Sequence, residues 1–152
     1  MPAAEPPPER PREPNLLDPS EFMRLVGLQF DELGPTRVSG HIECGPAHHQ
    51  PWGAVHGGVY ATVIETAATT GAYLAVRDRG QTAVGVTNTS HFLRAHERGR
   101  LRVLATALHQ GRSGQLWEVE ITRPSDGRRV AVGSVRLQNL DNPSGAPASL
   151  TG

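Results

Sequence analysis

The segment that decides the fold reads GGVYATVIETAATTGAYLAV and occupies residues 57–76. It predicts one long helix that begins at Gly57 or Gly58 and ends near Val76. Its apolar side chains point in nearly every direction, so we expect the helix to be buried on most sides. A membrane-spanning helix is not expected, because the run is short and contains Glu65 and four threonines.

Segments with alternating apolar and polar residues surround this helix, and a period of two predicts strands. We expect two strands before the helix and four after it, over residues 28–33, 36–43, 81–92, 99–110, 115–123 and 128–140. A short helix should precede the first strand, with Asp18 as its N-cap, Pro19 in its first turn and Gly27 at its end. Helices gathered on one face of an antiparallel sheet define an α+β fold.

The predicted sheet has a helix on one face only, and it should leave two long edge strands exposed. A dimer that extends the sheet, or that packs sheet on sheet, would cover these surfaces. We therefore expect a homo-oligomer.

The composition of the 152 residues excludes several classes of function. The chain has 15 basic and 15 acidic residues, so no charge surplus favours binding to nucleic acid or to a membrane surface. Every basic residue is arginine, which excludes Schiff-base chemistry on a lysine. The single cysteine, Cys44, excludes an internal disulfide and indicates a reducing compartment, so we expect a cytoplasmic protein.

The ends of the chain differ in composition from its centre. Residues 1–14 contain six of the 13 prolines and no apolar run, so we expect a disordered tail rather than a secretion signal. Residues 141–152 are rich in Pro, Gly, Ser and Thr and should form a flexible tail. One domain is expected over residues 15–140.

Glu65 is the first candidate for chemistry, because it is the only carboxylate between Glu43 and Asp78 and lies inside the apolar helix. Such a group either faces a pocket or is neutralised by an arginine from a strand, and the sequence leaves both open. Thr69, four residues on, shares the face of Glu65 and could orient a water or a substrate carbonyl. Its hydroxyl could equally bond back to its own helix.

The helix begins at His56-Gly57-Gly58, where glycines allow close approach of a ligand and the first N–H groups point outward. This arrangement suits the stabilisation of an oxyanion formed during acyl transfer. The seven histidines have no zinc-binding spacing, so no metal site is expected. Cys44 follows a strand and lacks the surroundings of a nucleophile, so a buried thiol is expected.

These motifs resemble those of the hot-dog fold acyl-CoA thioesterases. The resemblance is specific in QPWGAVHGGVY at residues 50–60 and IETA at 64–67. It continues in VGVTNTSHF at 84–92, HQGR at 109–112 and QLWEV at 115–119, and it covers about residues 28–140. The nearest branch includes the phenylacetate-pathway enzymes and one class of 4-hydroxybenzoyl-CoA thioesterases. The resemblance implies a long central helix wrapped by a curved antiparallel sheet.

The resemblance also implies roles for individual residues. Glu65 matches a general base or nucleophile, and the Gly57 N–H matches the donor to the thioester carbonyl. Gln50 and His56 match loop residues that position the thioester and assist the departing thiol, and Thr69 matches a residue that orients the hydrolytic water. The residues that the resemblance assigns to substrate binding are His91, Gly58, Asn88, Arg94, Arg112 and Ser113. The last three lie in or next to turns where members of the family hold the phosphates of CoA.

The expected function is therefore hydrolysis of a CoA or carrier-protein thioester with an aromatic or medium-chain acyl group. No metal or redox cofactor is needed for this reaction. The family resemblance implies a homodimer or homotetramer with active sites at the subunit interface. The alternatives are a non-catalytic acyl-CoA-binding protein, a dehydratase or hydratase acting on acyl thioesters, and, last, a purely structural oligomer.

Overall fold

A computed structural model describes residues 15–16 and 19–142. The elements in chain order are α1 (Glu21–Val26), β1 (Gln29–Leu33), β2 (Arg37–Cys44), the 3-10 helix η1 (Pro46–His48), α2 (Gly57–Val76), the 3-10 helix η2 (Arg77–Arg79), β3 (Gln81–Phe92), β4 (Gly99–Gln110), β5 (Gly114–Arg123) and β6 (Arg128–Asp141). The expected tail at 1–14 lies outside the described residues. So does the expected C-terminal tail, except for Asp141, which ends β6, and Asn142.

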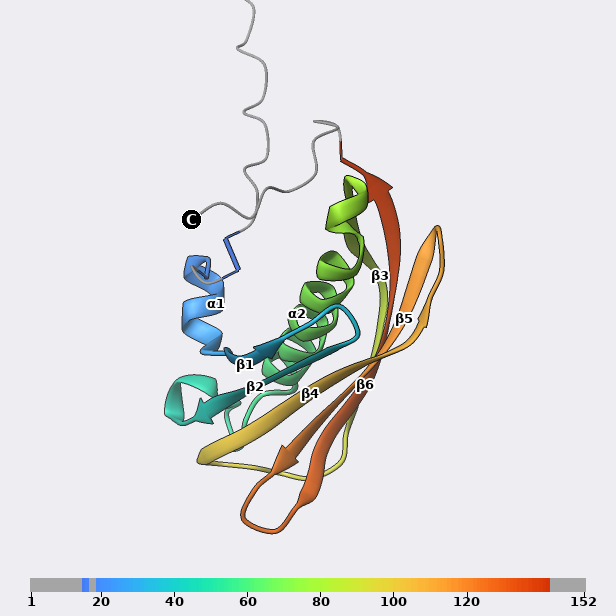
Figure 1. Ribbon diagram of the computed structural model, residues 1–152. Coiled ribbons are helices and arrows are strands. Elements are labelled where there is room, and N and C mark those ends of the chain that lie inside the picture. Colours follow the sequence, from blue (N-terminus) through green and yellow to red (C-terminus); the bar gives the residue numbers. More distant parts are fainter. Residues whose placement is uncertain (1–14, 17–18, 143–152) are drawn as a thin grey trace, which may run out of the picture.

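The strands form one antiparallel sheet in the order β1-β2-β4-β5-β6-β3. The sheet curves around α2, which lies along its concave face (Figure 1). This arrangement confirms the expected α+β architecture. The predicted strand boundaries agree with the observed ones to within one residue, and the alternation in β5 is as expected, with Trp117, Val119 and Ile121 buried.

The central helix α2 is buried on most sides, as its sequence predicts. Nine of its 20 residues are buried, and they include Tyr60, Ile64, Ala68 and Ala72. Close packing explains a glycine in the middle of the helix: a Cβ at Gly71 would lie 2.3 Å from the Trp117 ring. Within the described part of the chain, no helix has the length and apolar character needed to cross a membrane.

The short helix α1 begins later than the sequence predicts. Its first residue is Glu21, and its N-cap is Ser20, whose Oγ accepts a hydrogen bond from the Met23 N–H at 3.3 Å. Asp18, the expected cap, lies outside the described residues. Serine and aspartate are equally good caps, so the pattern could not decide between them. Gly27 ends the helix with φ +80°, as predicted.

The two edges of the sheet differ in length. One edge is β1, with only five residues, so the expectation of two long edge strands is wrong. The other edge is β3, which has 12 residues and pairs with β6 along one side only. The outer face of the sheet carries polar side chains such as Arg102, Glu118 and Arg136, all exposed to solvent. Edge pairing through β3 is therefore a better route to association than packing through the outer face.

Candidate active site

One face of α2 runs along β3 and carries the main candidate residues. Gly57, Ala61, Glu65 and Thr69 follow one another at intervals of four, so they form one stripe on the helix. The edge strand touches this stripe at its first residue and along its middle. A Cβ at Gly57 would lie 2.5 Å from the ring of Phe92, and the middle of β3 contacts Ala61 and Glu65. We call this region the α2–β3 seam.

The Glu65 carboxylate is half-buried in the seam and is held by the strand. The Asn88 side-chain amide donates to its Oε2 at 3.2 Å and to the Ala61 carbonyl oxygen at 3.0 Å. On the other side, Gly85 lets the carboxylate approach the backbone, because a Cβ there would lie 1.9 Å from Oε1. Among the described residues no arginine pairs with Glu65, so the alternative of neutralisation by a strand arginine is wrong for this subunit.

The N-terminus of α2 presents an unpaired donor. His56 is the N-cap, and its Nδ1 accepts a hydrogen bond from the Gly58 N–H at 2.8 Å. The neutral imidazole therefore carries its proton on Nε2, which remains a donor. The N–H of Gly57 has no partner among the described residues, and the ring of Phe92 lies against this glycine. A free N–H at a helix N-terminus is suited to stabilising developing negative charge.

The Thr69 hydroxyl is buried and has no hydrogen-bond partner in the part of the chain that the structure describes. The hydroxyl does not donate to a carbonyl oxygen of its own helix, which was the alternative to a catalytic role that the sequence left open for this residue. Thr62 and Thr66 do so, donating to the carbonyl oxygens of Gly58 and Thr62, each at 2.8 Å. Thr69 therefore differs from Thr62 and Thr66 in having an unused hydroxyl, which lies one turn beyond Glu65.

Gln50 lies in the loop before α2, and its side chain serves that loop. Its Oε1 accepts a hydrogen bond from the Trp52 N–H at 2.5 Å, and its backbone N–H donates to the Ala54 carbonyl at 2.8 Å. No contact joins Gln50 to Glu65 within this subunit's described residues. Trp52, at the tip of the loop, is 87% exposed. The Gln50 amide nitrogen has no hydrogen bond to the residues that the structure describes, so it is available as a donor.

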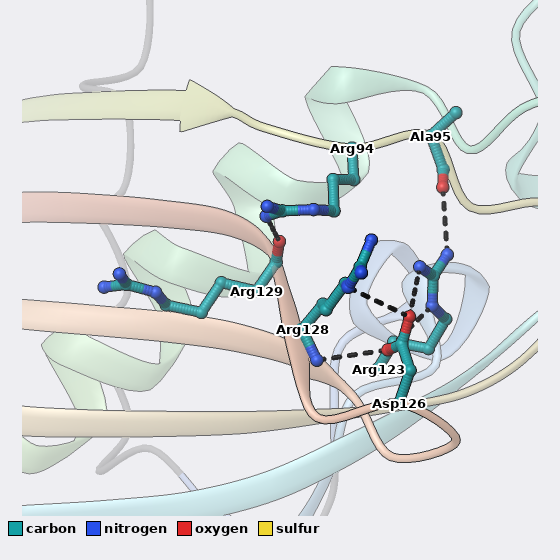
Figure 2. Close-up of polar contacts among 6 residues, drawn as sticks. All are labelled: Arg94, Ala95, Arg123, Asp126, Arg128 and Arg129. Atoms are coloured by element: carbon teal, nitrogen blue, oxygen red, sulfur yellow. Dashed lines mark hydrogen bonds and ion pairs between the residues drawn. The ribbon is translucent and has the colours of Figure 1, made fainter.

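Arginines gather at the end of β3 nearest to Gly57 (Figure 2). Arg94, two residues beyond Phe92, donates to the Arg129 carbonyl oxygen at 2.7 Å. Arg123 binds both carboxylate oxygens of Asp126, at 3.1 and 2.7 Å. This hydrogen bonding by Arg123, supported by the Arg128 backbone N–H, lowers the pKa of Asp126 to about 2. Arg129 also pairs with Glu120 at 3.0 Å, so two carboxylates stand among four arginines, and this end of the sheet keeps an excess of positive charge.

Two of the other predicted substrate-binding residues, Arg112 and Ser113, lie away from this end. The Arg112–Ser113 turn joins β4 to β5, and the Asn139 backbone N–H donates to the Ser113 carbonyl at 3.0 Å. Asn139 pairs with Ala83 near the start of β3, so the turn and Arg94 lie at opposite ends of that strand within one subunit. His91 is exposed and, by strand alternation, projects from the face of β3 opposite to Asn88. A single subunit does not bring these groups together.

Cys44 is a buried free thiol, as expected. Burial, assisted by the negative charge of Glu43, raises the pKa of the thiol to about 11. A raised pKa disfavours the thiolate, so Cys44 lacks the property that a catalytic cysteine requires. No group of three or more potential metal ligands gathers among the described residues.

A cavity of about 510 Å³ lies between α1, β1 and α2. Its walls are mainly apolar and include Met23, Leu28, Phe30, Thr66 and Thr70. None of the seam residues described above lines it, so this cavity is separate from the carboxylate.

The sequence analysis did not select Gly85 or Ser90, although both shape the surroundings of Glu65. The Ser90 hydroxyl donates to the Asn88 Oδ1 at 2.7 Å. Two signals could have found them. A glycine inside a strand marks a bulge or a close approach, and Ser90 lies two residues from Asn88, hence on the same strand face.

The family of the chain follows from comparison with known proteins. Residues 53–142 match the family model of the thioesterase superfamily. The chain therefore belongs to the thioesterase superfamily, and the fold is the expected hot-dog fold. Its enzyme class is that of a thioester hydrolase.

Among individual relatives, the protein Rv1847 of Mycobacterium tuberculosis is 41% identical over 139 residues, which cover 90% of this chain and 97% of the relative. Its solved structure superposes with a TM-score of 0.76 at 42% identity, covering 79% of this chain and 96% of that chain. The structure of AziG from S. sahachiroi gives a TM-score of 0.77 at 38% identity, with coverages of 82% and 98%. The proofreading thioesterase EntH of Cronobacter turicensis is 35% identical over 104 residues, covering 68% of this chain and 74% of EntH.

Proposed function

We propose that the protein hydrolyses acyl-CoA thioesters in the α2–β3 seam. The observation that carries this proposal is the pairing of two groups on one face of α2. The Gly57 N–H is free at the helix N-terminus, and the Glu65 carboxylate lies two turns further along, held by an uncharged amide rather than by a cation. Thioester hydrolysis needs such a pair, a donor for the oxyanion and a carboxylate to deliver the nucleophile.

Eight residues of helix separate Gly57 from Glu65 by about 12 Å within one subunit. In the proposed reaction, the Gly57 N–H of one subunit therefore donates to the thioester carbonyl oxygen while the carbonyl carbon is attacked from the side of Glu65 in the other subunit. When Glu65 acts as general base, it removes a proton from water, the water oxygen bonds to the carbonyl carbon, and the carbon–sulfur bond breaks. The thiolate then takes the proton that Glu65 removed from water, and the His56 Nε2–H donates a hydrogen bond to the departing sulfur. The products are a carboxylic acid and a free thiol. The unused Thr69 hydroxyl is the proposed ligand of the attacking water.

A second route uses Glu65 as the nucleophile. Its carboxylate oxygen then attacks the carbonyl carbon, the thiol leaves, and water hydrolyses the resulting anhydride. The two routes differ in one observable. Rapid quenching during turnover, followed by mass spectrometry, should find the acyl group on Glu65 in the nucleophilic route and unmodified protein in the general-base route.

The positive end of the seam supports CoA as the thiol carrier. Arg94 and its neighbouring arginines lie just beyond Phe92, which itself lies against Gly57. A thioester placed at Gly57 could therefore extend its phosphates toward Arg94. The ring of Phe92 is exposed and packs on the buried Tyr60, with ring centroids 5.9 Å apart, and it favours an aromatic or medium-chain acyl group nearby.

We further propose a homodimer, or a homotetramer built from it, in which β3 strands pair across the interface. The seam runs beside this open edge, so its active site would lie at the interface. Arg112, Ser113 and His91, which are remote from Arg94 or turned away from Asn88 in one subunit, would then serve the site of the other subunit. Gln50 remains the proposed loop residue that positions the thioester. The buried free thiol of Cys44 suits a reducing compartment, and we propose the cytoplasm.

The test is release of free thiol from a panel of benzoyl, hydroxybenzoyl, phenylacetyl and straight-chain acyl-CoAs. Wild-type protein should release thiol, and Glu65→Gln, which preserves shape, should abolish release while CoA-thioester binding persists. Glu118→Gln is the matched control, because Glu118 is exposed on the outer face of the sheet. Retained activity in Glu65→Gln would refute the assignment of Glu65. Binding without hydrolysis by the wild type would instead indicate a non-catalytic acyl-CoA-binding protein.

A further inference from the structure

We infer that Asn88 and Ser90 are positioning residues for Glu65: the Ser90 hydroxyl fixes the Asn88 amide, and the amide fixes the carboxylate. This inference rests on the proposed function, because it assigns the reacting carboxylate to Glu65. It replaces the expectation that Asn88 binds substrate. It also adds a residue, Ser90, which contacts Glu65 only through Asn88.

The hydrogen bonds around Asn88 determine which way its amide faces. The NH₂ group donates to two atoms that can only accept, the Ala61 carbonyl oxygen at 3.0 Å and Glu65 Oε2 at 3.2 Å. The amide oxygen accepts from the Ser90 hydroxyl at 2.7 Å. If the amide turned over, its oxygen would face a carbonyl and a carboxylate, and both contacts would become repulsive. The Ser90 hydroxyl stabilises the productive orientation from the opposite side.

A bulge in β3 puts the residues on one side. The register with β6 shifts between Gly85 and Thr87, so Val86 is the extra residue. Gly85 and Asn88 are three apart and would point to opposite faces of a regular strand. With the bulge, both lie against Glu65, Gly85 beside Oε1 and Asn88 beside Oε2. The strand therefore confines both oxygens of the carboxylate.

Ser90 is itself held in place. It pairs with Gly133 of β6, and a Cβ at Gly133 would lie 3.3 Å from Ser90 Oγ and 2.7 Å from the Ile64 side chain. The hydroxyl thus occupies a narrow space between β6 and α2, with little freedom to leave Asn88. A carboxylate restrained through a fixed amide loses less freedom on reaching the transition state, which is how a positioning residue raises kcat.

The test combines single and double substitutions with thiol-release kinetics. Ser90→Ala should lower kcat by about tenfold with little change in KM, since a net hydrogen bond amounts to about 1–1.5 kcal/mol. Ser90→Thr keeps the hydroxyl and should restore kcat. The Asn88→Ala, Ser90→Ala double variant should be no slower than Asn88→Ala alone, because Ser90 acts only through Asn88. Thr89→Ala, on the opposite strand face, is the control and should match wild type.

The inference would be overturned if the fold-loss of kcat in the double variant equalled the product of the two single-variant losses. A raised KM with unchanged kcat in Asn88→Ala would also overturn it. A second measurement does not depend on catalysis. The side-chain amide NMR signals of Asn88 should shift in both Glu65→Gln and Ser90→Ala and stay unchanged in Thr89→Ala. Unshifted signals would refute the positioning pair. Shifted signals in a protein that hydrolyses no member of the panel would support the pair and refute the proposed function alone.

Discussion

Replacing Gly85 with alanine tests the geometry of the carboxylate more directly than removing the carboxylate does. An added Cβ would lie 1.9 Å from Glu65 Oε1, whereas non-bonded heavy atoms rest at about 3.5 Å. Glu65 must therefore withdraw by roughly 1.5 Å. The atom that moves is the end of a flexible, half-buried side chain, so the fold should absorb the change.

The expected effect of Gly85→Ala is a loss of activity without a loss of stability. A displacement of about 1 Å at a reacting group can reduce the rate about 100-fold, so kcat should fall by that order. The free energy of unfolding should change by less than about 0.5 kcal/mol, as for other surface substitutions.

Thiol release and urea unfolding on the same preparation measure both quantities. Gly45→Ala is the matched control, because Gly45 has extended backbone with φ −164° and nothing lies within 4 Å of its added Cβ. Wild-type kcat in Gly85→Ala would refute the reasoning, since the carboxylate would then function equally well elsewhere. Equal losses of kcat and stability would refute the claim that the effect is confined to Glu65.

Three further predictions concern stability and are measured by urea unfolding. Gly71→Ala should lower the free energy of unfolding by about 2 kcal/mol despite the better helix propensity of alanine, because the added Cβ would lie 2.3 Å from the buried Trp117 ring. Adding Trp117→Phe should recover part of this loss, and a double variant whose loss equals the sum of the two single losses would contradict the prediction. Gln115→Leu should cost about 3 kcal/mol by leaving buried polar groups unpaired, among them the Trp117 Nε1–H that donates to Gln115 Oε1 at 3.0 Å. Gln138→Leu, at an exposed position on β6, is the control and should cost little. Burial raises the pKa of Cys44 from 9.0 to about 11, so the folded state keeps a proton that the unfolded chain loses. The free energy of unfolding should therefore fall as the pH rises from about 9 to about 11, and Cys44→Ala should reduce this fall. An identical pH dependence in the variant would refute the assignment to Cys44.

The regular elements could be predicted because local pattern and tertiary environment agree. The helix at Gly57–Val76 is apolar on nearly all sides, and the strands alternate cleanly, so burial follows from the sequence. The start of α1 could not be predicted, since Asp18 and Ser20 are both suitable caps. The identity of the edge strands could not be predicted either, because the order of strands in the sheet depends on tertiary pairing rather than on local pattern.

The helix half of the candidate site could be predicted from spacing alone. Gly57, Glu65 and Thr69 share one face of any helix that contains them. The strand half could not, because it depends on a single bulge at Val86, which decides whether Gly85 faces the helix or solvent. The separation of Arg94 from Arg112 likewise depends on sheet order, since turns that look equivalent in sequence lie at opposite ends of β3.

The edge strand β3 performs two tasks with the same residues. Its 12 residues hold Glu65 through Gly85 and Asn88, and their outer backbone groups are open to pairing. A neighbouring subunit that hydrogen-bonds along this edge would stiffen the backbone that confines the carboxylate. Subunit association and substrate affinity would then be thermodynamically linked, and each would change the other by the same factor. The specific activity would in that case depend on protein concentration, falling on dilution and returning when saturating substrate drives the subunits together.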